Sequence, residues 1–248
     1  VEPSIATVID GVVMGRSGMA FNELLDIQRI EVLRGPQGML FGKNASGGVI
    51  HIITHDPSED FEAELNANTI LSGTQEHHIS GVVSAPLSNT LGLRVALFAT
   101  ERDGNIENVL TGKNINDRKN KGGRIKLKWQ ASENLDIKWS SDYSERNDEC
   151  CQPQARTATP FKASFLEPLT ASTDNDRVNI GADVYNASKS WGHSFELNWD
   201  IGDYTLTSLT AYRDWNSSSN QDVDGTPLSL LDINAGQSAQ NQSSARIS

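Results

Sequence analysis

The sequence predicts a mostly β protein, in which a small α+β unit precedes a series of antiparallel amphipathic strands. Three observations predict this fold class: short β-branched runs before residue 57, long two-residue alternation after it, and no apolar run near the roughly 18 residues of a membrane-spanning helix. The 248 residues allow one or two domains. Because Pro57 ends an apolar run, we expect one domain over 1–57 and a second over 58–248.

The first unit holds three apolar runs, at 6–12, 30–32 and 49–53. Their β-branched residues favour strands over helices. Residues 22–26 are long enough for one helical turn. The sequence therefore predicts a small α+β unit with buried strands.

Glycines and one proline mark the turns of this unit. Asp10-Gly11 and Gly35-Pro36 are typical turn dipeptides. Gly42, Gly47 and Gly48 permit a left-handed backbone or a close approach of two chain segments. We expect a tight loop that leads into the strand at 49–53.

From Phe61 onward, apolar residues alternate with polar ones, so each predicted strand has one apolar and one polar face. The clear segments are 61–68, 91–99, 124–129, 135–140 and 191–201. The segment 204–215 has no clean face. We expect about seven or eight strands, which is about a third of the wall of a plugged barrel of roughly 22 strands.

The connections are unequal in length. The turns at 87–90, 131–134 and 202–203 are short, whereas 104–121, 146–177 and 216–237 are long and polar. This asymmetry is typical of outer-membrane barrels. A secreted or surface β-sandwich that acts as a binding module shows the same alternation and remains the alternative.

Four elements in order resemble one protein family. They are IDGV at 9–12, RIEVLRGP at 29–36, LFGKNASGGVI at 40–50 and IIT at 52–54 before an Asp-Pro step. Together they resemble the plug domain of TonB-dependent outer-membrane receptors. The resemblance is close over roughly the first 57 residues, and we expect the later strands to be the first part of a transmembrane β-barrel.

The resemblance implies energy-coupled uptake of a scarce nutrient across the outer membrane of a Gram-negative bacterium. Ferric siderophores, haem, cobalamin or oligosaccharides are the typical ligands. The implied partners are a TonB-type energising protein, outer-membrane lipid and the small nutrient ligand. No signal peptide is visible, and we expect the chain to be a fragment without the segment that binds the energising protein.

Within the matched motif, the resemblance implies that Glu31 and Arg34 dock the plug against charges on the inner barrel wall. A plug that fills a polar lumen must pair its charges. The alternative is that Glu31 and Arg34 are solvated strand residues without a docking role.

The net charge of −11 argues against nucleic acid as a partner. The adjacent cysteines Cys150 and Cys151 could form a loop disulfide, ligate a metal or stay free. No second pair or suitably spaced histidine follows them, which disfavours a metal.

No enzyme, cofactor or metal site is predicted. The loop Gly38–Asn44 lacks the spacing and the Ser/Thr of a nucleotide-binding loop. The histidine pairs 51/55 and 77/78 lack a third ligand. Asp222-Val-Asp224-Gly225 is similar to the start of a calcium loop but lacks its later ligands, so a polar loop is favoured.

Overall fold

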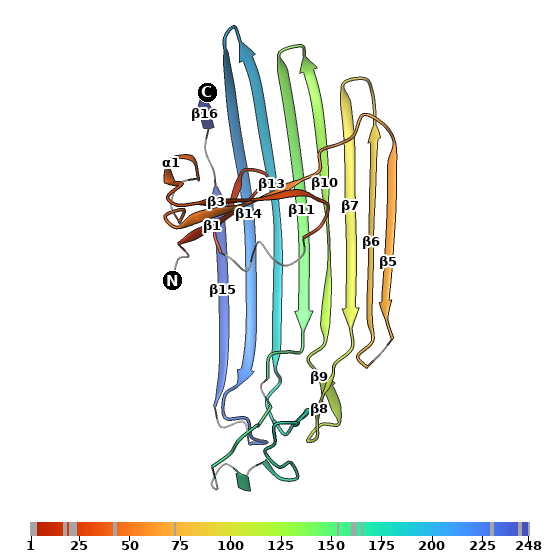
Figure 1. Cartoon of the computed structure of the whole chain (residues 1–248), viewed down its shortest axis with the longest axis vertical. Helices are drawn as coiled ribbons and strands as arrows, with labels where there is room; N and C mark the ends of the chain where they lie inside the picture. Colours follow the sequence, from red (N-terminus) through yellow and green to blue (C-terminus); the bar gives the residue numbers. More distant parts are fainter. Residues whose placement is uncertain are drawn as a thin grey trace.

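The computed structural model describes residues 4–16, 19, 24–41, 44–71, 73–152, 154–159, 163–164, 166–228, 231–242 and 245–247. In this part of the chain the strands form a 4-stranded sheet, a 9-stranded sheet and a 3-stranded sheet. We refer to the first two as the small sheet and the long sheet. Figure 1 shows the small sheet crossing one face of the long sheet between its two ends.

The small sheet has the strand order β2-β1-β4-β3. Its strands are β1 (Ile5–Ile9), β2 (Val12–Met14), β3 (Ile27–Arg34) and β4 (Gly48–Thr54). β1 pairs in parallel with β4, while the other two pairings are antiparallel. Val8 and Val49 are almost fully buried in its core. The three predicted apolar runs are thus all strands.

A short helix, α1 (Gly38–Phe41), follows the Gly35-Pro36 turn. The sequence prediction placed only a loop here. The helical turn predicted at 22–26 falls partly outside the described residues, and Leu24 and Leu25 are not helical.

The long sheet is an antiparallel meander. Its strand order is β15-β14-β13-β11-β10-β7-β6-β5, and β16 also pairs with β14. The strands are β5 (Glu62–Ile70), β6 (Glu76–Pro86), β7 (Leu91–Arg102), β10 (Arg118–Ser132), β11 (Leu135–Asp148), β13 (Tyr185–Ile201), β14 (Tyr204–Asp222), β15 (Asp232–Gln242) and β16 (Ala245–Ile247). The predicted fold class is confirmed. Among the described residues the sheet is open, with β5 and β15 at its edges.

One face of the long sheet is apolar and exposed. Its large side chains include Leu65, Leu97, Ile125 and Phe195, each 40% exposed or more. Such a face is unfavourable in water but suits lipid.

Aromatic residues bound this apolar face on β13. Trp191 and Trp199 are eight residues apart, which is about 26 Å along a strand. Trp191 lies beside Tyr212, with ring centroids 5.3 Å apart. Outer-membrane barrels carry an apolar band about 25 Å tall between two aromatic girdles, so the dimensions match.

The short and long connections lie at opposite ends of the sheet (Figure 1). Three short turns join β6 to β7, β10 to β11 and β13 to β14. The long connections follow β7 and β11. They carry the 3-stranded sheet of β8 (Ile106–Asn108), β9 (Lys113–Ile115) and β12 (Arg177–Val178).

The prediction of a third long loop, at 216–237, is wrong. β14 continues to Asp222 and β15 begins at Asp232, so the connection is far shorter. Residues 216–220 read as a polar loop, yet each pairs with both β13 and β15. A strand that extends beyond the apolar band meets water on its outer face, so alternation disappears there without loss of strand structure.

The β-sandwich alternative does not fit this arrangement. A sandwich buries the apolar faces of two stacked sheets against each other. Here the small sheet lies on the polar face of the long sheet, and the apolar face stays exposed. Among the described residues, no helix combines the length and apolar character needed to cross a membrane.

Candidate functional site

The small sheet contacts the polar face of the long sheet through buried ion pairs, and Lys126 of β10 is central to them. Its ammonium group lies 3.0 Å from Asp10 Oδ2 and 3.3 Å from Asp56 Oδ1. It also donates a hydrogen bond to the Thr54 carbonyl at 3.2 Å. Lys126 is only 8% exposed, so its charge depends on these partners.

The local fold of the small sheet orients Asp10. This residue lies in the turn between β1 and β2 with φ of 47°, a conformation that aspartate tolerates better than most residues. Its carboxylate accepts hydrogen bonds from the Thr54 backbone N–H at 2.9 Å and from the Thr54 hydroxyl at 2.7 Å. The turn is therefore tied to the end of β4, with one oxygen facing Lys126.

Asp56, in the segment after β4, bridges two strands of the long sheet. It accepts a hydrogen bond from Lys138 at 2.8 Å and another from Lys126 at 3.3 Å. Burial alone would raise the pKa of the Asp56 carboxyl. The hydrogen bonds and charges of Lys138 and Lys126 outweigh burial, and the pKa lies below its ordinary value.

A second contact joins Asp26, just before β3, to Arg94 of β7. The guanidinium donates to both carboxylate oxygens at 2.7 Å, and it also donates to Glu62 at 3.1 Å. The side chains of Arg94 and Asp26 are only 9% and 6% exposed. A bidentate, charge-assisted pair of this kind fixes orientation as well as position. Nearby, Arg124 donates to the Leu25 carbonyl at 3.0 Å.

An apolar contact completes the interface at β14. Val12, Met14 and Met19 pack against Ala211 and Trp215. This contact explains why the segment 204–215 has no clean face in the sequence. The inner face of β14 is apolar where the small sheet covers it.

The β1–β2 turn approaches β14 very closely at Gly11. A Cβ atom on Gly11 would lie 2.9 Å from Leu209 Cδ2, and its φ is +81°. Both the space and the backbone conformation thus require glycine.

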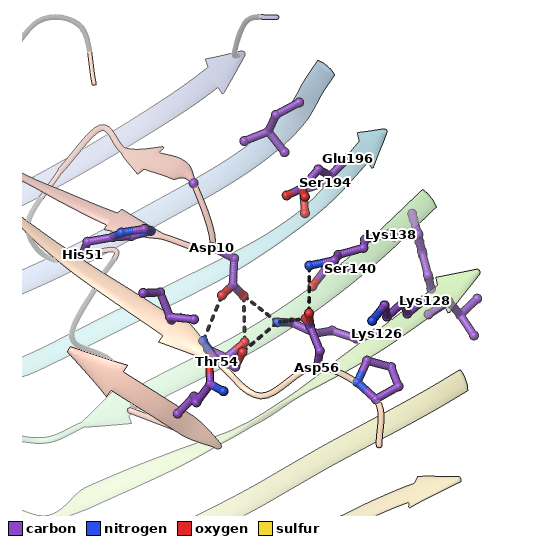
Figure 2. A pocket seen from close by; sticks show the side chains of 17 residues that line it. Asp10, His51, Thr54, Asp56, Lys126, Lys128, Lys138, Ser140, Ser194 and Glu196 are labelled. Atoms are coloured by element: carbon purple, nitrogen blue, oxygen red, sulfur yellow. Dashed lines mark hydrogen bonds and ion pairs between the residues drawn. The ribbon is translucent and has the colours of Figure 1, made fainter. Parts of the chain in front are cut away.

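A cavity of about 290 Å³ lies between the two sheets beside these ion pairs (Figure 2). Asp10, Asp56, Lys126, Lys138 and Glu196 line it. His51 of β4 also lines it; its Nδ1 is 3.4 Å from Glu31, and its buried Nε2 has no hydrogen-bond partner among the described residues. The interface is therefore polar and contains room for water.

A polar interface of this kind can form and separate reversibly. Ion pairs beside a cavity with room for water can exchange partners with water, whereas a tightly packed apolar interface cannot. In the described part of the chain, no group of three His, Cys, Asp or Glu residues is placed to hold a metal.

The two predicted docking residues lie on β3. Glu31 pairs with Arg29 of the same strand at 2.8 Å, and this hydrogen bond lowers its pKa. Arg34 accepts a weak hydrogen bond at its carbonyl from Gln37. The structure does not bring them together with the long-sheet pairs at Asp10, Asp26 and Asp56, and their docking role stays a prediction.

The predicted loop residues flank α1. Gly35 has φ of +82° directly after β3, and Pro36 follows it. Gly47 donates its N–H to the Ser4 carbonyl at 2.8 Å. Gly48 approaches β3 so closely that a Cβ would lie 2.6 Å from the Leu33 carbonyl oxygen. Gly42 lies outside the described residues.

Cys150 and Cys151 are joined by a disulfide in the structure, in the long connection after β11. They lie far along the chain from the contact between the sheets. Of the three possibilities that the sequence left open, the structure contains the loop disulfide.

Sequence reasoning missed the residues that carry the contact: Asp10, Asp26, Asp56, Arg94, Lys126 and Lys138. One signal was available. Basic residues on the polar face of 124–129 and acidic residues beside the turns of the first unit have opposite charges.

Comparison with known proteins agrees with this geometry. Residues 2–49 match the family model of the TonB-dependent receptor plug domain. The chain is 39% identical over 84 residues to an iron-regulated outer membrane virulence protein of Vibrio cholerae, covering 31% of this chain and 12% of that protein. It is 32% identical over 112 residues to the pesticin receptor of Yersinia pestis, covering 45% of this chain and 16% of the receptor.

Among solved structures, the ferric yersiniabactin uptake receptor from Yersinia pestis has the same fold. The TM-score is 0.75 at 20% identity, over 97% of this chain and 36% of that receptor. The chain thus spans well under half the length of these similar proteins.

Proposed function

Since the chain belongs to the TonB-dependent outer-membrane receptors, we propose that it serves the energy-coupled uptake of a ferric siderophore across the outer membrane of a Gram-negative bacterium. One observation carries the proposal. A unit that matches the plug family lies on the polar face of an amphipathic barrel wall and is held there by buried ion pairs.

The ligand class is supported by similar proteins that are named as receptors for ferric yersiniabactin and ferric enterobactin. The ferric siderophore is the cargo of the protein and not a resident cofactor. Haem, cobalamin or an oligosaccharide would be the cargo if the uptake test below fails for siderophores.

We propose the division into a plug over 1–57 and barrel wall over 58–248. The last strand of the small sheet ends at Thr54, and the first strand of the long sheet begins at Glu62, which supports it. In this proposal a TonB-type protein in the periplasm supplies the work that moves the plug.

The ion pairs of Lys126 and Arg94 give this movement a physical basis. A plug must stay closed at rest, yet open at a cost that an energising partner can supply. Buried pairs beside a cavity with room for water resist opening but can be replaced by water when the small sheet moves. The ion pairs therefore hold the plug in its closed position but can be broken when the energising partner acts on it.

We also propose that Glu31 and Arg34 dock the plug against a part of the barrel wall that the strands described above do not include. β3 is an edge strand of the small sheet, and its Val32 is 66% exposed. This edge has surface left to contact further wall. Reversing both charges would then loosen the plug, whereas a purely solvated role predicts no effect.

The test is iron uptake by a deletion strain that carries the complete receptor gene. We expect accumulation of ⁵⁵Fe supplied as ferric yersiniabactin or ferric enterobactin in iron-limited medium, and loss of uptake when a protonophore removes the membrane potential. The empty vector is the control.

Uptake that persists without the proton gradient would contradict energy coupling. Failure with every siderophore, with growth on haem, cobalamin or oligosaccharides instead, would replace the ligand class and keep the transport mechanism.

A further inference from the structure

A second cavity, of about 410 Å³, is lined by residues of the connection after β11 and of the end of β14. Figure 1 shows these segments at the far end of the long sheet from the short turns. Gln152, Asn179 and Asp222 line the cavity. They come from the segment after β11, from the residue after β12 and from the end of β14. Three separate parts of the chain thus meet around one space.

Each of these three side chains has an oxygen atom without a hydrogen-bond partner among the described residues. The atoms are Gln152 Oε1, Asn179 Oδ1 and Asp222 Oδ2. The residues are only 6%, 4% and 4% exposed. A buried acceptor without a partner destabilises the fold and is rare in native proteins. Three of them around one cavity indicate a ligand that supplies positive charge or donors.

In two of these side chains, Asn179 and Asp222, the second polar atom already has hydrogen-bond partners. Asn179 Nδ2 donates to the Glu167 carbonyl at 2.6 Å and to the Leu166 carbonyl at 3.4 Å. Asp222 Oδ1 accepts from the Gly225 N–H at 2.6 Å. Neither side chain can therefore turn to satisfy its remaining oxygen without breaking an existing bond.

The charge around the cavity is mixed, because acidic and basic residues both lie beside it. Asp224 and Asp232 lie near Asp222 and add to its negative potential. Two arginines, Arg156 and Arg177, also line the cavity, but both are exposed. Arg156 donates to the Thr173 carbonyl and Arg177 lies beside Asp176, so neither is paired with Asp222.

We propose that this cavity binds a calcium ion, with the Asp222 carboxylate and the amide oxygens of Asn179 and Gln152 as protein ligands and water at the remaining positions. Carboxylate and amide oxygens are the ligands of hard cations. Calcium tolerates the irregular geometry of a loop site, whereas magnesium demands a near-ideal octahedron and zinc prefers nitrogen and sulfur. The proposal does not depend on the ligand that the receptor transports.

Such an ion would fix the long connection after β11 to the end of β14. The connection after β7 is already linked to this region, because the buried amide of Asn108 donates to the Ile180 carbonyl at 3.0 Å.

The test is calorimetric titration of CaCl₂ into the full-length receptor in detergent, after removal of calcium with EGTA. We expect one site with a Kd of about 10⁻⁴–10⁻³ M, the range of extracellular calcium modules, and weaker binding of MgCl₂. Asp222→Asn keeps the acceptor for Gly225 but removes the charge, and it should weaken binding about tenfold or more.

Asp232→Asn is the matched control, because it removes a nearby exposed charge that is not a proposed ligand. Gln152→Glu adds a carboxylate ligand and should tighten binding about tenfold. This gain keeps the test decisive even if Asp222→Asn folds poorly.

Two results would overturn the proposal. One is the absence of a calcium signal in both the unmodified receptor and Gln152→Glu. The other is equal weakening by Asp222→Asn and Asp232→Asn, which would indicate general attraction by negative charge and not ligation.

Discussion

At the scale of single residues, the contact between the sheets depends on Lys126, which is buried and has two carboxylates within 3.3 Å. Removing one partner of a buried ion pair costs far more than the pair contributes, because the remaining charges stay buried without compensation. The effect of a substitution here should therefore exceed that of removing a similar lysine nearby.

We predict that Lys126→Met in the full-length receptor weakens docking of the small sheet by about 3 kcal/mol. Ion conductance of the receptor in planar bilayers should rise, because the plug leaves its closed position more often. Lys128→Met is the control: this lysine lines the same cavity, and no ion pair is observed for it among the described residues. Equal conductance in the two variants would refute a closing role for Lys126.

The lowered pKa of Asp56 predicts a specific pH dependence. A carboxyl whose pKa is lower in the folded state stabilises that state above its unfolded value of about 3.9, and the stabilisation disappears as pH falls through the lowered pKa. We expect hydrogen exchange in β4 to stay constant from pH 8 to 5, after correction for the intrinsic rate, and to accelerate below about pH 4. Asp56→Asn should flatten this profile, and a transition near neutral pH would argue against the assignment.

The docking residues could not be found from sequence because their partners are remote. Asp26 and Arg94 are 68 residues apart, and Asp56 and Lys138 are 82 apart. No local spacing encodes such pairs. Family resemblance proposed a docking role for Glu31. The structure instead shows Asp10 in the contact with Lys126, although the sequence predicted only a turn at Asp10.

At the scale of elements, the β1–β2 turn must fit against β14. We predict that Gly11→Ala loosens the small sheet, because the added Cβ would clash with Leu209 as well as strain the backbone. Gly35→Ala is a matched control: its φ is +82°, close to the +81° of Gly11, but no atom of the described residues lies within 4 Å of the new Cβ.

Both variants should lose about 1–2 kcal/mol to the left-handed backbone. Only Gly11→Ala should also speed proteolytic release of residues 1–57 from the full-length receptor. If the two variants release this segment at the same rate, the approach to Leu209 does not hold the sheets together.

Strands were predictable where one face meets lipid and the other meets water, as in 91–99 and 191–201. Prediction failed where that contrast disappears. β14 has 19 residues, whereas a transmembrane strand needs roughly 9–11. Its far end is polar on its outer face, and its inner face near Ala211 is apolar because the small sheet covers it.

At the scale of the whole molecule, the exposed apolar face predicts a strong dependence on membrane depth. Val95 is central among the outward apolar residues of β7, and Glu101 lies on the same face beyond them. We predict that Val95→Arg destabilises the receptor in lipid vesicles by about 2–4 kcal/mol, whereas Glu101→Arg costs about 0–1 kcal/mol. Urea titration, followed by heat-modifiable gel migration, measures both.

Similar losses in the two variants would mean that this face does not lie in lipid.

Sequence alone could assign the barrel because alternation, loop asymmetry and the plug motif agree. It could not reveal which face of the wall the small sheet covers, since that depends on contacts between segments far apart in the chain.

The meander order of the long sheet has a consequence for how the molecule assembles. Consecutive strands from β5 to β15 pair with each other, apart from the short strands in the connections, so each strand joins the one that precedes it in the wall. The loop that must close at each step is then only as long as one connection, and its entropy cost grows slowly with length. The wall can therefore grow by one hairpin at a time at a single advancing edge. The parallel pairing of β1 with β4 closes within the first 54 residues, so the small sheet can form before any of the wall exists.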